Sequence, residues 1–153
     1  MFDFEQQLKV GKKGEDSLLI RFPFLEKTDG RKADFIIKEG YPCAGDFLEL
    51  KTETRTIEET KNFFIESYSD TERRTVGGPW RARNDGVRFY AHLFKCGALY
   101  IFDTAILLPH LVKAIKIKKI PAKKIKNKTW VTTGYAVSRE LLIETPACVY
   151  SKS

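Results

Sequence analysis

Residues 32–54 carry the stretch KADFIIKEGYPCAGDFLELKTET, and this stretch decides the fold that we expect. Its two apolar runs, DFII at 34–37 and FLELK at 47–51, are short, and the segment between them contains glycine and proline. Such runs on either side of such a segment are typical of two β-strands joined by a turn. Carboxylates are rare in buried strands, yet each run contains one.

Three charged residues lie in these two strands. Asp34 begins the first strand, and Glu49 and Lys51 lie inside the second. Because side chains alternate along a strand, Glu49 and Lys51 share one face, whereas Leu48 and Leu50 share the other. Two carboxylates bind a hard divalent cation such as Mg²⁺ through oxygen, and a lysine beside them can position or activate a water molecule. The hydrolysis of a phosphodiester requires these residue types.

Asp34, followed after a turn by Glu49-Leu50-Lys51, resembles the D…(D/E)xK signature of the PD-(D/E)xK nuclease superfamily, which includes junction resolvases and restriction, homing and phage endonucleases. The resemblance covers the first half of the chain. It implies a restriction-endonuclease-like α/β fold, with a mixed central sheet flanked by helices. It also implies that Asp34, Glu49 and the Leu50 carbonyl bind Mg²⁺ or Mn²⁺, and that Lys51 activates water. Ala33 stands where the motif has proline, which is a tolerated variation.

The same superfamily often places a further glutamate on the helix before the first strand. A helix is expected at residues 2–22, although Gly11 and Gly14 weaken the pattern, and Glu15 lies at the family's position. An ordinary glutamate in an early helical turn, stabilised by the helix dipole, explains Glu15 equally well. The neighbouring Lys12 and Lys13 are placed to contact a nucleic-acid backbone.

The charged strands allow a second interpretation. A half-exposed antiparallel hairpin also alternates charged and apolar residues, and cross-strand ion pairs would then explain Glu49 and Lys51. The protein would in that case be a non-catalytic, basic nucleic-acid-binding module. A formal charge of +7 favours an anionic partner such as DNA in both cases, although a modest basic excess also serves solubility.

The remaining elements follow from apolar patterning and helix-start signals. Strands are expected at 24–27, 62–67, 87–94, 98–102 and 130–133, and short helices are expected to begin at Pro79, Pro109 and Ser138. Residues 68–78 have no periodicity and predict a mobile loop, and residues after 145 predict an irregular tail. His92, inside an expected strand, is expected to be a core or edge histidine with a satisfied hydrogen bond.

Basic residues in three regions are the expected contacts with DNA. Arginines of the segment 73–83 are expected to line one side of a cleft. The segment 113–128, KAIKIKKIPAKKIKNK, interleaves eight lysines with isoleucines, and lysines neutralise phosphates without reading bases. A solvated charged face is the alternative for this segment. The predicted nucleic-acid-binding residues are Lys12, Lys13, Arg73, Arg74, Arg81, Arg83, Lys118, Lys119, Lys123 and Lys124.

The length of 153 residues predicts a single nuclease domain, 1–153, with the lysine-rich segment at 113–128. Three widely separated cysteines without a CxxC pair argue against a disulfide or zinc scaffold and for a reducing compartment. No apolar run spans a membrane and no signal peptide is recognised, so we expect a cytoplasmic or intracellular protein with no membrane partner, as a phage-encoded endonuclease in its host would be.

A homodimer is also expected. A small nuclease domain offers one active site, and cutting both strands of a duplex requires two. The expected hairpin at 87–102 and the helix after Pro109 carry the apolar surfaces that would form the interface.

Overall fold

The computed structural model describes residues 4–153 as a mixed α/β protein. The elements in chain order are α1 (Phe4–Arg21), β1 (Leu25–Lys27), β2 (Phe35–Ile37), β3 (Phe47–Thr52), β4 (Asn62–Asp70), β5 (Thr75–Val76), α2 (Gly78–Asn84), β6 (Phe89–Leu93), β7 (Leu99–Asp103), α3 (Thr104–Ile117), β8 (Lys123–Lys126), β9 (Val131–Ser138), α4 (Arg139–Ile143) and β10 (Cys148–Lys152).

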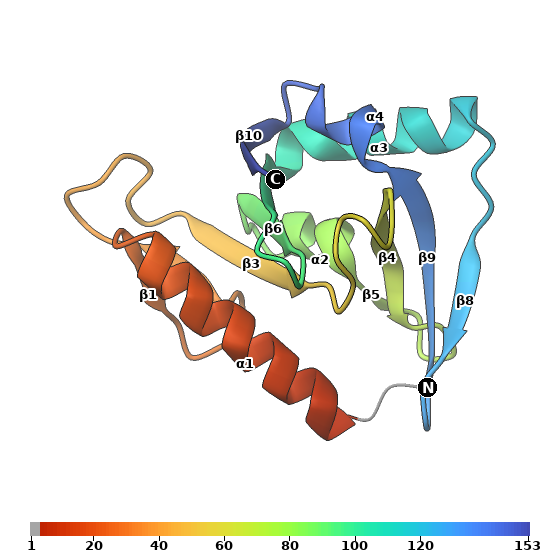
Figure 1. Cartoon of the computed structure of the whole chain (residues 1–153), viewed down its shortest axis with the longest axis horizontal. Helices are drawn as coiled ribbons and strands as arrows, with labels where there is room; N and C mark the ends of the chain where they lie inside the picture. Colours follow the sequence, from red (N-terminus) through yellow and green to blue (C-terminus); the bar gives the residue numbers. More distant parts are fainter. Residues whose placement is uncertain (1–3) are drawn as a thin grey trace.

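The strands form two sheets (Figure 1). The first sheet has the order β1-β2-β3-β6-β7-β10, in which only the pair β3–β6 is parallel. The second sheet has the order β5-β4-β9-β8 and is antiparallel. Between β3 and β6 the chain therefore leaves the first sheet, builds β4 and β5 of the second, and returns through α2.

Helix α1 covers one face of the first sheet. Its Leu18 is fully buried against Leu25, Phe35 and Leu48 of the first three strands. Gly14 permits this approach, because a Cβ atom there would lie 2.5 Å from Oγ1 of Thr52. Because Gly14 has no side chain, α1 packs closely against β3, and Glu15 next to it is carried to the same place.

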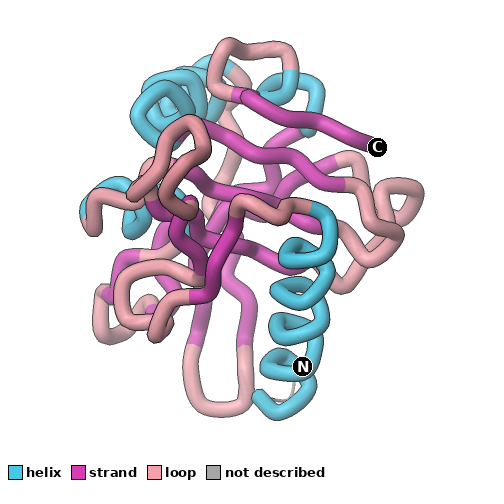
Figure 2. Tube along the Cα trace, turned by 90° about the vertical axis from the view of Figure 1, so that its left-hand side faces the viewer, coloured by secondary structure: helices cyan, strands magenta, loops and turns pink. Residues whose placement is uncertain are grey.

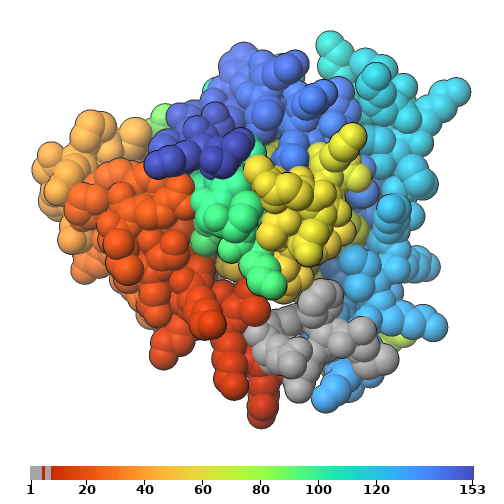
Figure 3. All heavy atoms as spheres, viewed as in Figure 1, coloured from red at the N-terminus to blue at the C-terminus, as the bar shows by residue number. Residues whose placement is uncertain are grey.

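The opposite face of the first sheet packs against the second sheet and the other helices. Phe63 of β4 makes edge contacts with Tyr100 and Phe102 of β7, and Leu107 and Leu111 of α3 complete this cluster. A third, smaller cluster joins α2 to β6. Figure 2 shows the strands between α1 and the remaining helices. In the space-filling view, the segment between β3 and β4 (yellow) separates α1 (red to orange) from the strands β8 and β9 (blue) on this face (Figure 3).

Several predicted elements are confirmed. The decisive stretch forms an antiparallel pair in which Phe35 lies opposite Leu48. The hairpin expected at 87–102 is the antiparallel pair β6–β7. Helix α2 has Pro79 in its first turn, as expected for a residue that lacks an amide hydrogen. The general α/β class with a mixed sheet and flanking helices is therefore correct.

The prediction that a helix opens at Pro109 is wrong. Helix α3 begins at Thr104, and Pro109 lies inside it. Asp103 caps the helix, because its Oδ1 accepts hydrogen bonds from the backbone N–H groups of Ala105 and Ile106. This cap and the burial of Leu107 in the core outweigh the single backbone hydrogen bond that proline removes.

Two segments expected to be irregular are strands. β4 continues to Asp70 and pairs with β5, so residues 68–78 are not a loop throughout. Residues after 145 include β10, which pairs with β7 and completes the first sheet. Ser138 occupies the N-cap position of α4, but its side chain makes no capping hydrogen bond.

His92 is buried in the core, but the predicted hydrogen bond is absent. Neither ring nitrogen has a partner among residues 4–153, and the nearest carboxylate oxygen, Oε2 of Glu53, is 4.0 Å from Nε2. Burial lowers the pKa of His92 to about 3, so the ring is neutral. The β6–β7 hairpin around it is also buried, which removes it as the expected dimer surface. Within residues 4–153, no helix is long and apolar enough to cross a membrane.

Candidate active site

The strand register brings Asp34 and Glu49 together. Phe35 pairs with Leu48, so Asp34 lies across from Glu49 immediately beyond the last paired residues. The backbone N–H of Leu50 donates a 2.7 Å hydrogen bond to Oδ2 of Asp34. Because the N–H and C=O of one strand residue point to the same side, the Leu50 carbonyl faces the same edge as Asp34.

The two carboxyl groups share a proton at neutral pH. Partial burial is the main cause that raises the pKa of Glu49 to about 8, and the charge of Asp34 and a hydrogen bond to it add to this effect. Arg81 opposes the shift by favouring the charged form of Glu49. Burial also raises the pKa of Asp34, against the hydrogen bond from Leu50. Two carboxyl groups this close behave as one coupled acid.

Glu15 reaches the same place from α1. The nearby Glu15 raises the pKa of Asp34, in addition to the larger effect of burial. Glu15 also forms a 3.3 Å ion pair with Nζ of Lys27. The three acidic residues that the motif singles out therefore gather at one edge of the sheet.

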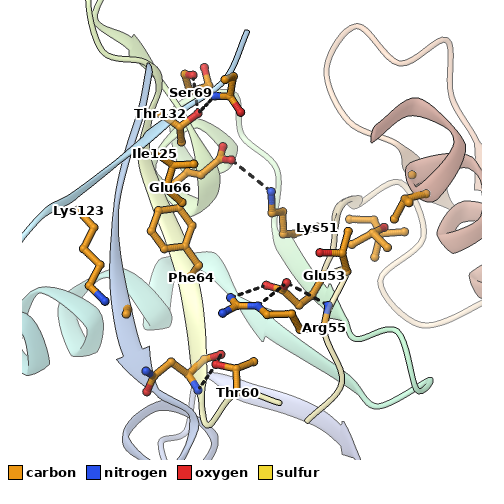
Figure 4. A pocket seen from close by; sticks show the side chains of 18 of the residues that line it. Lys51, Glu53, Arg55, Thr60, Phe64, Glu66, Ser69, Lys123, Ile125 and Thr132 are labelled. Atoms are coloured by element: carbon orange, nitrogen blue, oxygen red, sulfur yellow. Dashed lines mark hydrogen bonds and ion pairs between the residues drawn. The ribbon is translucent and has the colours of Figure 1, made fainter. Parts of the chain in front are cut away.

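Lys51 lies on the same strand face as Glu49, but its charge partner is Glu66. The Lys51 Nζ is 3.2 Å from Oε1 of Glu66, which comes from β4 in the other sheet (Figure 4). Glu66 is not among the site residues that the sequence predicts. The signal that identifies it is weak: it is the only charged residue in the apolar segment 62–67.

Two cavities meet at these residues. A small pocket of about 120 Å³ is lined by Glu49, Lys51, Glu66, Arg81 and Tyr90, among others. A groove of about 770 Å³ lies between the two sheets and α1. The two share four lining residues, which are Leu50, Lys51, Glu66 and Ser69. The small pocket, which Glu49 and Glu66 line, thus opens beside the groove, whereas Asp34 and Glu15 line neither cavity.

Only some of the predicted nucleic-acid-binding residues lie at the two cavities. Arg81 lines the small pocket and Lys123 lines the groove. Lys12 and Lys13 are exposed on α1, next to Gly11 at the groove wall. The other predicted residues are exposed and line neither cavity; they are Arg73, Arg74, Arg83, Lys118, Lys119 and Lys124.

The carboxyl pair of Asp34 and Glu49 fits a divalent cation of the Mg²⁺ type. Within residues 4–153, no three side chains of histidine, cysteine, aspartate or glutamate are arranged as a ready metal cage. Mg²⁺, however, is commonly bound by one or two carboxylates together with water and substrate phosphate. Asp34 and Glu49 supply two such carboxylates, and the proton that they share without a cation is the one a cation would displace.

The comparisons with known proteins give no relative. No protein-family model, curated protein or solved structure matches the chain.

Proposed function

We propose that this protein is a metal-dependent endonuclease that hydrolyses phosphodiester bonds of DNA. The observation that carries the proposal is the coupled carboxyl pair of Asp34 and Glu49, with Lys51 on the same face and a groove beside it. Glu49 lines the small pocket, and neither carboxyl group belongs to the three hydrophobic clusters of the described residues. Perturbed carboxyl groups in a cleft are candidates for catalytic function.

Asp34, Glu49 and the Leu50 carbonyl are the groups that would hold the metal ion. When bound, Mg²⁺ or Mn²⁺ polarises the scissile phosphate and stabilises the leaving oxygen. Asp34 is fixed for this role by the hydrogen bond from the Leu50 N–H, which leaves its second oxygen free of that bond. Glu15 adds negative charge beside Asp34 and strengthens the attraction for a cation.

Lys51 would orient the attacking water and offset the negative charge that develops on the phosphate. Glu66 holds the Lys51 ammonium group at the junction of the pocket and the groove. Arg81 lines the same pocket and supplies a second positive charge, although it is also paired with Asp85 at 3.5 Å. A phosphate bound between Lys51 and Arg81 would meet two positive side chains, which supports the proposal.

A second candidate function is the non-catalytic nucleic-acid-binding module. The Lys51–Glu66 contact favours it, because an ion pair across two sheets is what a purely structural role for Lys51 predicts. This candidate predicts binding that depends on salt but not on Mg²⁺.

The test is cleavage of labelled single-stranded DNA, duplex, nicked duplex, fork, four-way junction and RNA, each with Mg²⁺, Mn²⁺ or EDTA. The Asp34→Asn and Glu49→Ala variants should abolish metal-dependent cutting and leave DNA binding intact or tighter. Glu26→Ala is the matched control, since Glu26 is an exposed strand glutamate away from both cavities. Cutting by Glu49→Ala at the wild-type rate would contradict the site, and binding without any cutting would favour the second candidate.

A further inference from the structure

The groove between the sheets contains apolar side chains that the hydrophobic core does not use. Phe64 of β4, Ile125 of β8 and Trp130 before β9 all line it. None of them belongs to the three hydrophobic clusters of the described residues. Ile125 is 36% exposed, and Phe64 and Trp130 are half-buried. Apolar groups gathered in a concave site of this size mark a place for a ligand.

A glycine makes room for the Phe64 ring. A Cβ atom at Gly134 of β9 would lie 2.6 Å from Cζ of Phe64 and 2.6 Å from the Ile65 carbonyl oxygen. The ring therefore lies against the bare backbone of β9, and one of its sides is free to face the groove (Figure 4). A fixed, flat aromatic surface of this kind suits stacking of a planar ring.

Cations accompany these apolar groups. Lys123, Ile125 and Asn127 alternate with Lys124 and Lys126 along β8 and its end, and only the first three line the groove. Lys123 has no ion-pair partner among residues 4–153. Arg55 and Lys51 lie across the groove, each with one carboxylate partner of its own (Figure 4).

We propose that this groove binds an unpaired strand of nucleic acid, with a base against Phe64 and Trp130 and the backbone at Lys123. Proteins that bind single strands combine a cationic track with aromatic surfaces on which bases stack. A paired base is already stacked within the duplex, so the apolar groove favours unpaired nucleotides. The proposal rests on the proposed function for its ligand class, and it narrows the substrate to DNA with a single-stranded segment beside the cut.

Binding measured in EDTA tests the groove separately from cleavage. Fluorescence anisotropy of a labelled 12-nucleotide dT strand, an rU strand and a 12-base-pair duplex would be compared at one salt concentration. We expect either single strand to bind about tenfold or more tightly than the duplex. Equal or tighter binding of the duplex would overturn the proposal.

The groove variants sharpen this test. Phe64→Ala should weaken single-strand binding roughly 5- to 150-fold, the range for removal of one stacking partner. The exposed Val149→Ala on β10 is its control, because Val149 lines neither cavity. Lys123→Ala should weaken binding more than Lys124→Ala, which changes the same strand on its other face. Wild-type affinity in folded Phe64→Ala, or equal effects of the two lysines, would overturn the assignment.

A spectroscopic readout does not depend on these variants. In the Trp80→Phe background only Trp130 remains, and binding of the dT strand should quench its fluorescence. Unchanged Trp130 emission at saturation would contradict stacking in the groove. Strand binding without cleavage of any substrate would support the groove as a strand-binding site and show that the proposed nuclease activity is wrong. Cleavage that Phe64→Ala leaves unchanged would support the nuclease activity and show that the groove assignment is wrong.

Discussion

The proton shared by Asp34 and Glu49 links the site to the stability of the protein. The pKa of Glu49 is raised from 4.5 to about 8 on folding, so the folded state binds more protons than the unfolded state between these pH values. The contribution of Glu49 to stability therefore falls as pH rises through this window, because the folded protein has to lose a proton or keep two charges together. Buried His92 acts in the opposite direction below pH 6.5, because its pKa is lowered from 6.5 to about 3 on folding.

We expect the melting temperature in EDTA to decrease from pH 6.5 to pH 8, where His92 no longer offsets the effect of Glu49. The loss is on the order of 1 kcal/mol per pH unit within the window. Glu49→Gln should flatten the curve, since it removes the titrating group, and Glu26→Gln should not. Thermal melts followed by circular dichroism measure this, and a rise in stability from pH 6.5 to pH 8 in wild type would show that the two carboxyl groups do not share a proton.

Glu66 positions Lys51 without touching the phosphate in the proposed reaction. Their 3.2 Å contact is partly exposed, so Glu66→Gln should change the free energy of unfolding by about 1 kcal/mol or less. Partners that orient active groups typically cost 10- to 100-fold in activity when they are changed, and we expect a loss of that order here. Cleavage rates and urea unfolding of Glu66→Gln check both expectations; equal activity would make the ion pair structural only.

At the scale of single residues, the sequence predicts which site residues lie together only where they are close along the chain. Alternation along β3 predicts that Glu49 and Lys51 share a face, and the structure confirms that they line one pocket. Glu66 could not be identified in the same way, because it reaches Lys51 from another sheet and its separation in sequence carries no periodic signal.

At the scale of single elements, errors arise where a local signal competes with tertiary packing. Pro109 is a local helix breaker, but α3 passes through it because Asp103 caps the helix and Leu107 and Leu111 are fully buried. The strand β10 is missed because its apolar residues, Cys148 to Tyr150, are consecutive and do not alternate with polar ones, and the neighbouring strand β7 supplies the pairing that its own residues do not predict.

Pro109→Ala should stabilise the protein. The exposed alanine would restore the N–H group that can donate to the Ala105 carbonyl. The free energy of unfolding should increase by about 1–3 kcal/mol. This range already includes the opposing effect of replacing proline, which gives the unfolded chain more conformational freedom. Urea denaturation measures it, and a loss of stability would show that the ring of Pro109 contributes packing that outweighs its missing hydrogen bond.

The lysine-rich segment is not one arm but the end of α3, a connection and β8. Lys116, Lys118 and Lys119 lie together at and after the last turn of α3 and are exposed. Replacing all three by alanine should weaken binding of long duplex DNA and reduce the slope of log K against log salt by about one for each phosphate that is no longer neutralised. Binding isotherms at several salt concentrations test this; an unchanged slope would make the segment a solvated face.

At the scale of the whole molecule, the groove exists because the chain leaves the first sheet after β3 and returns at β6. The second sheet is inserted in between, and its strands supply Phe64, Glu66 and Lys123. The sequence predicts the strands but not this division into two sheets, since pairing between distant segments such as β4 and β9 depends on the completed core.

Each chain carries one such site, so cleavage of both strands of a duplex requires two copies. If a homodimer acts on a supercoiled plasmid, wild type should produce linear DNA with little nicked intermediate. Mixing wild type with an excess of Glu49→Gln should then shift the product to nicked circles, because most active dimers would hold one working site. Gel analysis of the products over time, with Glu26→Gln in place of Glu49→Gln as control, makes the comparison. If nicked circles accumulate for wild type alone and the mixture only dilutes the rate, the protein acts as a monomer, which agrees with a groove that takes one unpaired strand.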